Sequence, residues 1–166
     1  MGLKERLEGR KRPFATYWVL VDQEGAAVAE ERLADARTRY QTLLIVSAGE
    51  DRVAEAAEQV ARRLADVRAC YEPIRLTAMM PDDFERLVGA HPPRPGTDDE
   101  VWDTKALPRE CFFRCAPEEM TRTEWEEFLT GRVSEAERSA LFNTAVAANV
   151  RVLDPTVPKD STPTPS

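Results

Sequence analysis

Two stretches of helical periodicity decide the fold: AAVAEERLADARTRYQTLLIV at residues 26–46 and VAEAAEQVARRLADV at residues 53–67. Apolar residues recur every three or four positions through most of both. In the first stretch they are Val28, Leu33, Ala36, Tyr40, Leu43 and Leu44. In the second they are Val53, Ala57, Val60, Leu64 and Val67. Two such stripes, joined by the short polar turn at residues 47–51, predict an antiparallel αα-hairpin packed like a coiled coil.

The sequence on either side of this hairpin is typical of β-strands. Residues 14–21 (FATYWVLV) are aromatic and β-branched, and residues 71–79 (YEPIRLTAM) alternate in character. Pro73 confines the second strand to an edge position or a bulge. Two strands that bracket a hairpin pair most simply in the antiparallel sense at its base. Because a two-stranded ribbon is marginal by itself, we expect later helices to cover it.

The second half of the chain is predicted to be helical. A helix begins at Pro81 and is ended by HPPRPG at residues 91–96, and a short helix spans residues 107–115. Capping boxes at Thr121 and Ser134 begin two more helices.

The predicted fold class is therefore mainly α (α+β), with an N-terminal two-stranded antiparallel ribbon around an αα-hairpin and a C-terminal helical bundle. We expect four segments along the chain. They are a flexible N-terminus (1–13), a strand–hairpin–strand unit (14–80), a helical unit (81–153) and a disordered Pro/Thr/Ser tail (154–166).

Charge and composition exclude several classes of partner. The formal net charge is −7, from 30 acidic and 23 basic residues. Nucleic acids and anionic membranes select basic surfaces, so neither is an expected partner. No stretch approaches the roughly 20 apolar residues of a membrane span, and the N-terminus lacks the apolar segment of a signal peptide. The odd set of three cysteines suits a reducing compartment.

Residue types that commonly carry chemistry lack the partners that chemistry requires. His91, the single histidine, precedes two prolines and is better explained as part of a helix-terminating turn than as a catalytic or metal-binding group. Cys111 and Cys115 share a helix face, as a metal pair would, but core packing beside Phe112 and Phe113 explains them more simply. No glycine-rich phosphate motif is present. We therefore predict no catalytic residue, no metal and no cofactor, and hence no enzymatic activity.

Six apolar side chains are predicted to contact a partner. Met79 and Met80 lie beside Phe84, where they would form either an adaptable contact surface or plain core. Trp102 lies in an acidic loop (97–103), as a contact residue or as a structural anchor. Trp125 and Phe128, which share a helix face, complete the set.

From the hairpin onward, residues 15–152 resemble the tail assembly chaperones of tailed bacteriophages, of the siphophage type found in phages of actinobacteria. The resemblance lies in the order and spacing of short motifs. These are FERLVGAHPP at 84–93, the acidic loop with Trp102, Leu107–Pro108 before the cysteine-containing helix, EWEEFL at 124–129 and a Ser-opened helix ending at Asn149. The aromatic strand at 17–20 and the short hairpin loop depart from the family pattern.

The resemblance implies a function in the host cell cytoplasm. Tail assembly chaperones coat the phage tape measure protein, keep it soluble, help to recruit the major tail tube protein and leave the finished tail. Many are made in two lengths by a ribosomal frameshift, and the tail at 154–166 would suit the end of a short form. Alternative functions are a structural tail or head-completion subunit, or a small phage regulatory protein that binds a host factor. Self-association is also open, because the periodicity suits packing within the hairpin or against a second copy.

Overall fold

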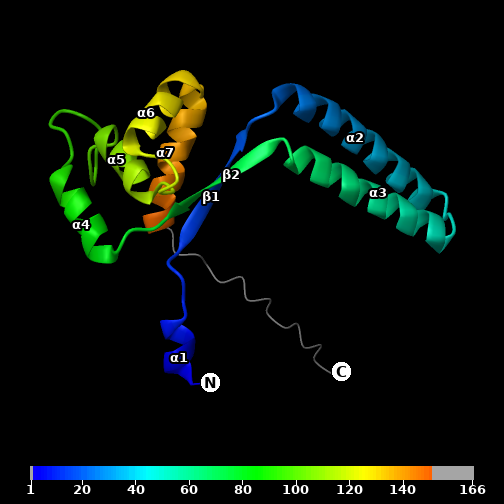
Figure 1. Ribbon diagram of the computed structural model, residues 1–166, viewed down its shortest axis with the longest axis horizontal. Helices are drawn as coiled ribbons and strands as arrows, with labels where there is room; N and C mark the ends of the chain where they lie inside the picture. Colours follow the sequence, from blue (N-terminus) through cyan, green and yellow to red (C-terminus); the bar gives the residue numbers. More distant parts are fainter. Residues whose placement is uncertain (1, 151–166) are drawn as a thin grey trace. The chain divides into compact units, whose positions relative to one another are not determined.

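The computed structural model describes residues 2–150 and contains seven helices and one two-stranded sheet in this range. In chain order the elements are α1 (Leu3–Glu8), β1 (Phe14–Leu20), α2 (Gln23–Ile45), α3 (Glu50–Arg68), β2 (Tyr71–Thr77), α4 (Pro81–Ala90), α5 (Ala106–Cys115), α6 (Arg122–Gly131) and α7 (Glu135–Val150) (Figure 1). The predicted mainly helical α+β class is confirmed. The predicted tail at 154–166 lies outside the described residues.

The chain divides into two compact units, and the division falls within the two strands. One unit is Thr16–Arg75, called here the hairpin unit; the other, called here the helical unit, comprises the residues up to Ala15 and those from Leu76 onward. In the latter, α1 forms where the sequence predicted a flexible segment without a regular element. All six of its residues are exposed, so local helical bonding and not burial accounts for it.

The register of the two strands explains the position of Pro73. The N–H of Val21 donates to the carbonyl of Cys70, and the N–H of Ala78 donates to the carbonyl of Pro13, both at 2.9 Å. Between these two bonds an antiparallel ladder places Pro73 opposite Trp18, at a position whose backbone N–H would point away from β1. The proline therefore removes no hydrogen bond between the strands, and the predicted edge position is correct.

Alternation along the strands gives the ribbon one buried and one exposed face. Val19, Ile74 and Leu76 are buried on one face, whereas Trp18 and Pro73 are exposed on the other. This is the pattern expected of a sheet covered on one side only.

Helices α2 and α3 run side by side in opposite directions (Figure 1), which confirms the predicted hairpin. The Asp22 carboxylate caps α2 by accepting from the N–H of Gly25 at 2.9 Å. A Cβ atom on Gly25 would lie 2.0 Å from an oxygen of that carboxylate, so a larger residue there would force the Asp22 side chain to move. The chain turns at Ser47, whose φ of 49° is in the left-handed region.

The buried stripe of the hairpin differs in part from the predicted one. Its fully buried residues in α2 and α3 are Ala26, Ala29, Leu33 and Ala56. Val28 and Leu44, predicted to be in the stripe, are 47% and 50% exposed, and Ala57 is also exposed. Because alanine is small, the two helices can approach closely where alanines face each other. The helices therefore bury alanine positions, and larger apolar residues such as Val28 stay exposed beside the contact.

The helical unit has an aromatic core centred on Phe112, which is fully buried in α5. The Trp125 ring meets Phe112 edge to face, with centroids 5.4 Å apart, and Phe142 of α7 approaches it at 5.6 Å. The predicted capping boxes are confirmed. Thr121 and Glu124 exchange hydrogen bonds at the start of α6, and Ser134 and Glu137 do so before α7.

The side chain of Asn149 joins the last turn of α7 to the end of β2 and to α5. Its Oδ1 accepts from the N–H of Met79 at 2.8 Å, and its Nδ2 donates to the carbonyl of Ala145 at 2.9 Å. The same Nδ2 lies 3.4 Å from the sulfur of Cys111 and 3.2 Å from that of Cys115. One amide thus satisfies a partly buried backbone donor and positions two elements against α7.

We expect Asn149→Ala to lower the free energy of unfolding by about 1–3 kcal/mol, because the Met79 N–H loses its acceptor in a partly buried place. Urea denaturation measures this change. Asn143→Ala is the matched control on the exposed side of the same helix and should change stability by less than about 0.5 kcal/mol. Equal losses in the two variants would contradict the assigned role of Asn149.

Candidate binding surfaces

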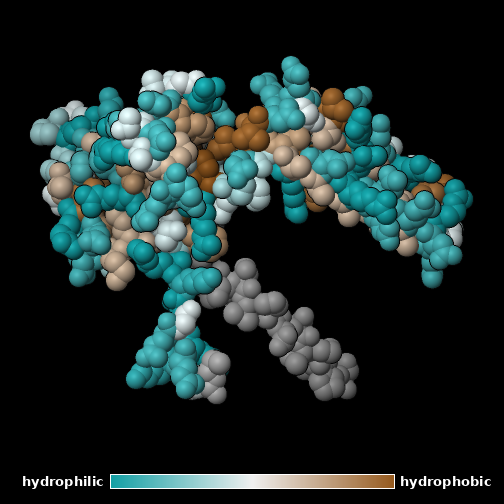
Figure 2. All heavy atoms as spheres, in the orientation of Figure 1, coloured by the Kyte–Doolittle hydropathy of each residue, from teal (hydrophilic) through white to brown (hydrophobic). Residues whose placement is uncertain are grey.

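The loop end of the hairpin exposes three consecutive apolar side chains. Leu44, Ile45 and Val46 are 50%, 83% and 64% exposed. They end α2 and enter the turn at Ser47, and hydrophobic atoms appear at this end of the hairpin among mainly hydrophilic ones (Figure 2). Covering such a cluster with a partner lowers the free energy, because apolar surface is removed from water. This surface is called here the hairpin tip.

One side of the hairpin forms a groove of about 290 Å³, lined along three turns of each helix. The lining residues are Arg32, Asp35, Ala36, Arg39 and Leu43 from α2 and Arg52, Glu55, Ala56, Gln59 and Arg63 from α3. Within each helix they recur at spacings of mainly three and four, so each set occupies a single helix face. This surface is called here the hairpin groove.

A second hollow of about 730 Å³ lies in the helical unit, between α5, α6 and α7, and the Phe113 and Phe142 side chains contribute to its lining. Its charged groups largely neutralise one another. Arg109 pairs with Glu126 at 3.1 Å, and Arg138 pairs with Glu135. This hollow therefore offers apolar contact but little unbalanced charge.

The structure separates the six predicted contact residues by exposure. Met80 is exposed as the residue preceding α4, Phe84 is half-buried in the first turns of that helix, and Met79 is half-buried with its N–H bound to Asn149. The exposed side chain of Met80 is the most accessible of these three.

The tryptophans differ from each other. Trp125 belongs to the core of the helical unit, where its Nε1 donates to the carbonyl of Pro117 at 3.2 Å and its ring contacts Phe128 at 5.8 Å. Trp102 is half-buried in its loop, beside Asp103, whose N–H donates to the carbonyl of His91 at 2.9 Å. The Trp125 ring is thus engaged within the fold, whereas Trp102 keeps part of its surface accessible.

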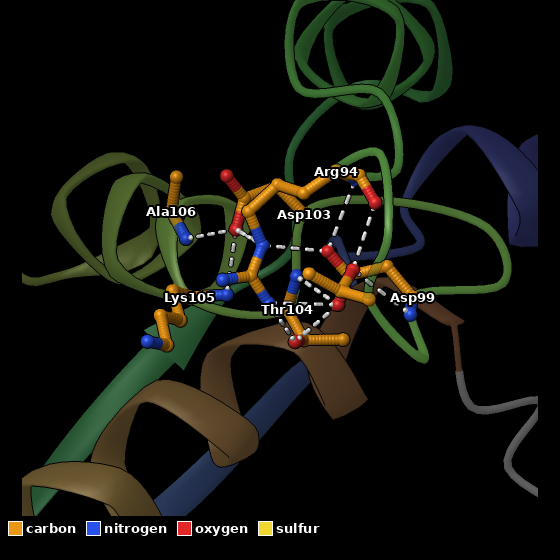
Figure 3. Close-up of polar contacts among 7 residues, drawn as sticks. Arg94, Asp99, Asp103, Thr104, Lys105 and Ala106 are labelled. Carbon is orange, nitrogen blue, oxygen red and sulfur yellow. Dashed lines mark hydrogen bonds and ion pairs between the residues drawn. The ribbon is translucent and has the colours of Figure 1, made fainter.

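An ion-pair cluster holds the loop between α4 and α5 in one conformation (Figure 3). The guanidinium of Arg94 binds the Asp99 carboxylate through two bonds, of 2.7 and 3.0 Å, and the Thr104 hydroxyl donates to the same carboxylate at 2.6 Å. The Asp103 carboxylate accepts from the N–H groups of Lys105 and Ala106, at the start of α5. The acidic loop is therefore an ordered structural element and not a string of solvated charges.

The contacts of this cluster shift the ionisation of its carboxyl groups. The Arg94 and Thr104 side chains hold the pKa of Asp99 well below its usual range, and the Asp99 side chain is only 3% exposed. Hydrogen bonds from the backbone of Ala106 and Lys105 lower the pKa of Asp103. Both groups are consequently ionised at neutral pH, and their role is structural.

The cysteines contribute to packing. Cys70, Cys111 and Cys115 are free and buried, as predicted for the pair in α5. The hydrogen bond with Cys115, together with burial, raises the pKa of the Cys111 thiol, which stays protonated at neutral pH. His91 ends α4, as expected, and its Nδ1 lies 2.9 Å from the carbonyl of Leu87. Within residues 2–150, no group of three or more His, Cys, Asp or Glu side chains is placed to hold a metal ion.

We expect Asp99→Asn to be less stable than the wild type at neutral pH, with a gap that narrows as the pH falls. Because folding lowers the pKa of Asp99, its ionised form stabilises the fold above the unfolded pKa of about 4, and this stabilisation is lost progressively below it. Urea unfolding at about pH 7 and about pH 3 tests this. The exposed neighbour provides a control, since Asp98→Asn should match the wild type at both pH values. A gap for Asp99→Asn that is independent of pH would contradict the assignment.

Sequence reasoning missed both the hairpin groove and the tip. The arginines at 32 and 39 and the residues Leu44–Val46 could be read from the sequence, but the periodicity alone did not show which side of each helix stays exposed.

Among the described residues, no helix has the length and apolar character needed to cross a membrane. Comparisons with protein-family models, curated proteins and solved structures gave no significant match to this chain.

Proposed function

We propose that this protein is a tail assembly chaperone of a tailed bacteriophage, which acts by binding and not by catalysis. It covers the tape measure protein in the host cell cytoplasm before the tail tube forms, helps the major tail tube protein to assemble, and leaves the finished tail. The observation that carries the proposal is the hairpin tip, where Leu44, Ile45 and Val46 stand exposed at the end of two long helices.

The physical requirements of such a chaperone agree with this surface. A long helical client with exposed apolar stripes aggregates unless those stripes are covered. A helical hairpin offers apolar side chains on a rigid support, and helix-in-groove contact is a common way to bind an amphipathic helix. The net charge of −7 keeps a complex of chaperone and client from associating further. The order of motifs from FERLVGAHPP to Asn149 points to the same family.

Co-expression with the tape measure protein of the same phage tests the proposal. We expect the wild-type chain to bring the tape measure protein into the soluble fraction. Ile45→Glu should lower affinity for it by about tenfold, because binding would then desolvate a carboxylate. The fold should be unaffected, since Ile45 is exposed. Pull-down from the soluble fraction measures the change.

Val101→Glu is the matched control, because Val101 is also apolar and exposed, at 62% against 83% for Ile45, but lies in the helical unit. It should leave binding unchanged. A tape measure protein that stays insoluble with the wild-type chain would overturn the proposed function. Mass spectrometry of purified particles separates the alternative, since a structural tail subunit would be present in stoichiometric amount and a chaperone would not.

A further inference from the structure

The hairpin groove carries positive charge in an acidic protein. Four arginines and only two acidic residues, Asp35 and Glu55, line it, whereas the whole chain has 30 acidic and 23 basic residues. Arg32, Arg39 and Arg52 form no ion pair with any residue in the described range, and Arg63 pairs with Asp66 at 3.0 Å. The second hollow, in the helical unit, shows the opposite arrangement, because its arginines already have acidic partners.

The floor of the hairpin groove is apolar, and most of its side chains are small. Ala56 is buried, and Ala36 and Leu43 are half-buried, while the arginines of α2 and Arg52 at the rim are exposed. Alanine at the floor lets another helix approach closely. Each wall spans three turns, which is about 16 Å at a rise of roughly 1.5 Å per residue. These dimensions and this polarity suit a third helix lying along the hairpin.

We infer that the hairpin groove binds an acidic amphipathic α-helix of a partner protein. The apolar stripe of that helix covers Ala36, Leu43 and Ala56. Glutamates and aspartates on both flanks of the stripe pair with Arg32 and Arg39 on one wall and with Arg52 on the other. Such flanking charges occupy the places that e and g residues take in coiled coils, where they choose the partner and its orientation.

The same charges disfavour other occupants. A second copy bound through the same groove about a two-fold axis would bring arginine walls against arginine walls, and like charges across a contact are repulsive. A nucleic acid backbone would meet Asp35 and Glu55 inside the groove and a net charge of −7 on the chain. A foreign helix avoids the first conflict, and its discrete carboxylates can be placed opposite Arg32, Arg39 and Arg52 and away from Asp35 and Glu55, which a continuous phosphate backbone cannot do.

This inference goes beyond the proposed function, because it assigns the chemistry of the bound helix and the residues that receive it. It holds for any protein that supplies such a helix. The hairpin tip and the groove are separate surfaces, so the variants at Ile45 and those in the groove test different statements. If the peptide does not bind, the inference about the groove fails but the proposed chaperone function is unaffected. If the tape measure protein stays insoluble, the proposed function fails but the inference about the groove is unaffected.

The test uses the full-length chain and two labelled helical peptides of about three heptads, with Leu at positions a and d. One peptide has Glu at e and g, and the other has Lys there, which keeps each from pairing with itself. Fluorescence anisotropy at low ionic strength should show the Glu peptide binding at least about tenfold more tightly than the Lys peptide. Added salt should reduce this preference, because the rim arginines are solvent-exposed.

Variants on one helix provide the matched comparison. Arg39→Glu should weaken binding of the Glu peptide by about tenfold, whereas Arg37→Glu, with the same change of net charge outside the groove lining, should leave it unchanged. Adding Arg52→Glu to Arg39→Glu should move the preference toward the Lys peptide. Thermal unfolding followed by circular dichroism checks that these exposed substitutions leave the fold intact.

Three outcomes would overturn the inference. The first is that the wild-type chain binds the two peptides equally well or binds neither of them. The second is equal loss in Arg37→Glu and Arg39→Glu, which would indicate a general charge effect. The third is a wild-type dimer, seen by analytical ultracentrifugation, that the double variant dissociates, which would make a second copy the occupant.

Discussion

The pairing of β1 with β2 is the constraint on which the described fold depends. Backbone hydrogen bonds close the ladder at both ends, at Val21–Cys70 and at Pro13–Ala78. The chain between these strands must leave and return to the same place, and α2 and α3 do so as an antiparallel pair of 23 and 19 residues. Closing a loop of this length costs entropy that grows only slowly with length, so a long hairpin is tolerated. Ala26, Ala29 and Cys70 form a buried cluster at its base, with Leu20, Val67 and Tyr71 packed against it.

The two units use burial differently. The helical unit buries Phe112, Leu107 and Leu141 completely and adds aromatic contacts around them. The α2–α3 contact of the hairpin unit buries mainly alanines, so much of its larger apolar surface stays accessible. Low burial per residue permits local opening at lower free energy than in a packed core. The proposed partner surfaces therefore lie where the fold depends least on the side chains.

Much of the fold could be predicted from the sequence, because its signals are local. The period of the apolar residues predicted both helices of the hairpin, and the Thr121–Glu124 and Ser134–Glu137 pairs predicted two helix starts. The exact stripe could not be predicted, since the preference for Ala26 and Ala29 over Val28 arises only when two helices meet. The bond of Asn149 to Met79 spans 70 residues of sequence and depends on tertiary placement. The bond of Asp99 to Arg94 is local but depends on the conformation of an irregular loop, for which the sequence has no periodic signal.

The position of Pro73 has a consequence for assembly. On the outer edge of β2 it offers no N–H, so a strand arriving there would face a gap in the middle of its ladder. The outer edge of β1 contains no proline at Thr16 and Trp18, and no third strand joins the sheet within residues 2–150. Edge-to-edge growth of a sheet into a fibre needs two competent edges on each molecule. A proline on one of the two edges therefore disfavours such growth, which works against amyloid-like stacking of a chain with exposed aromatic strand residues.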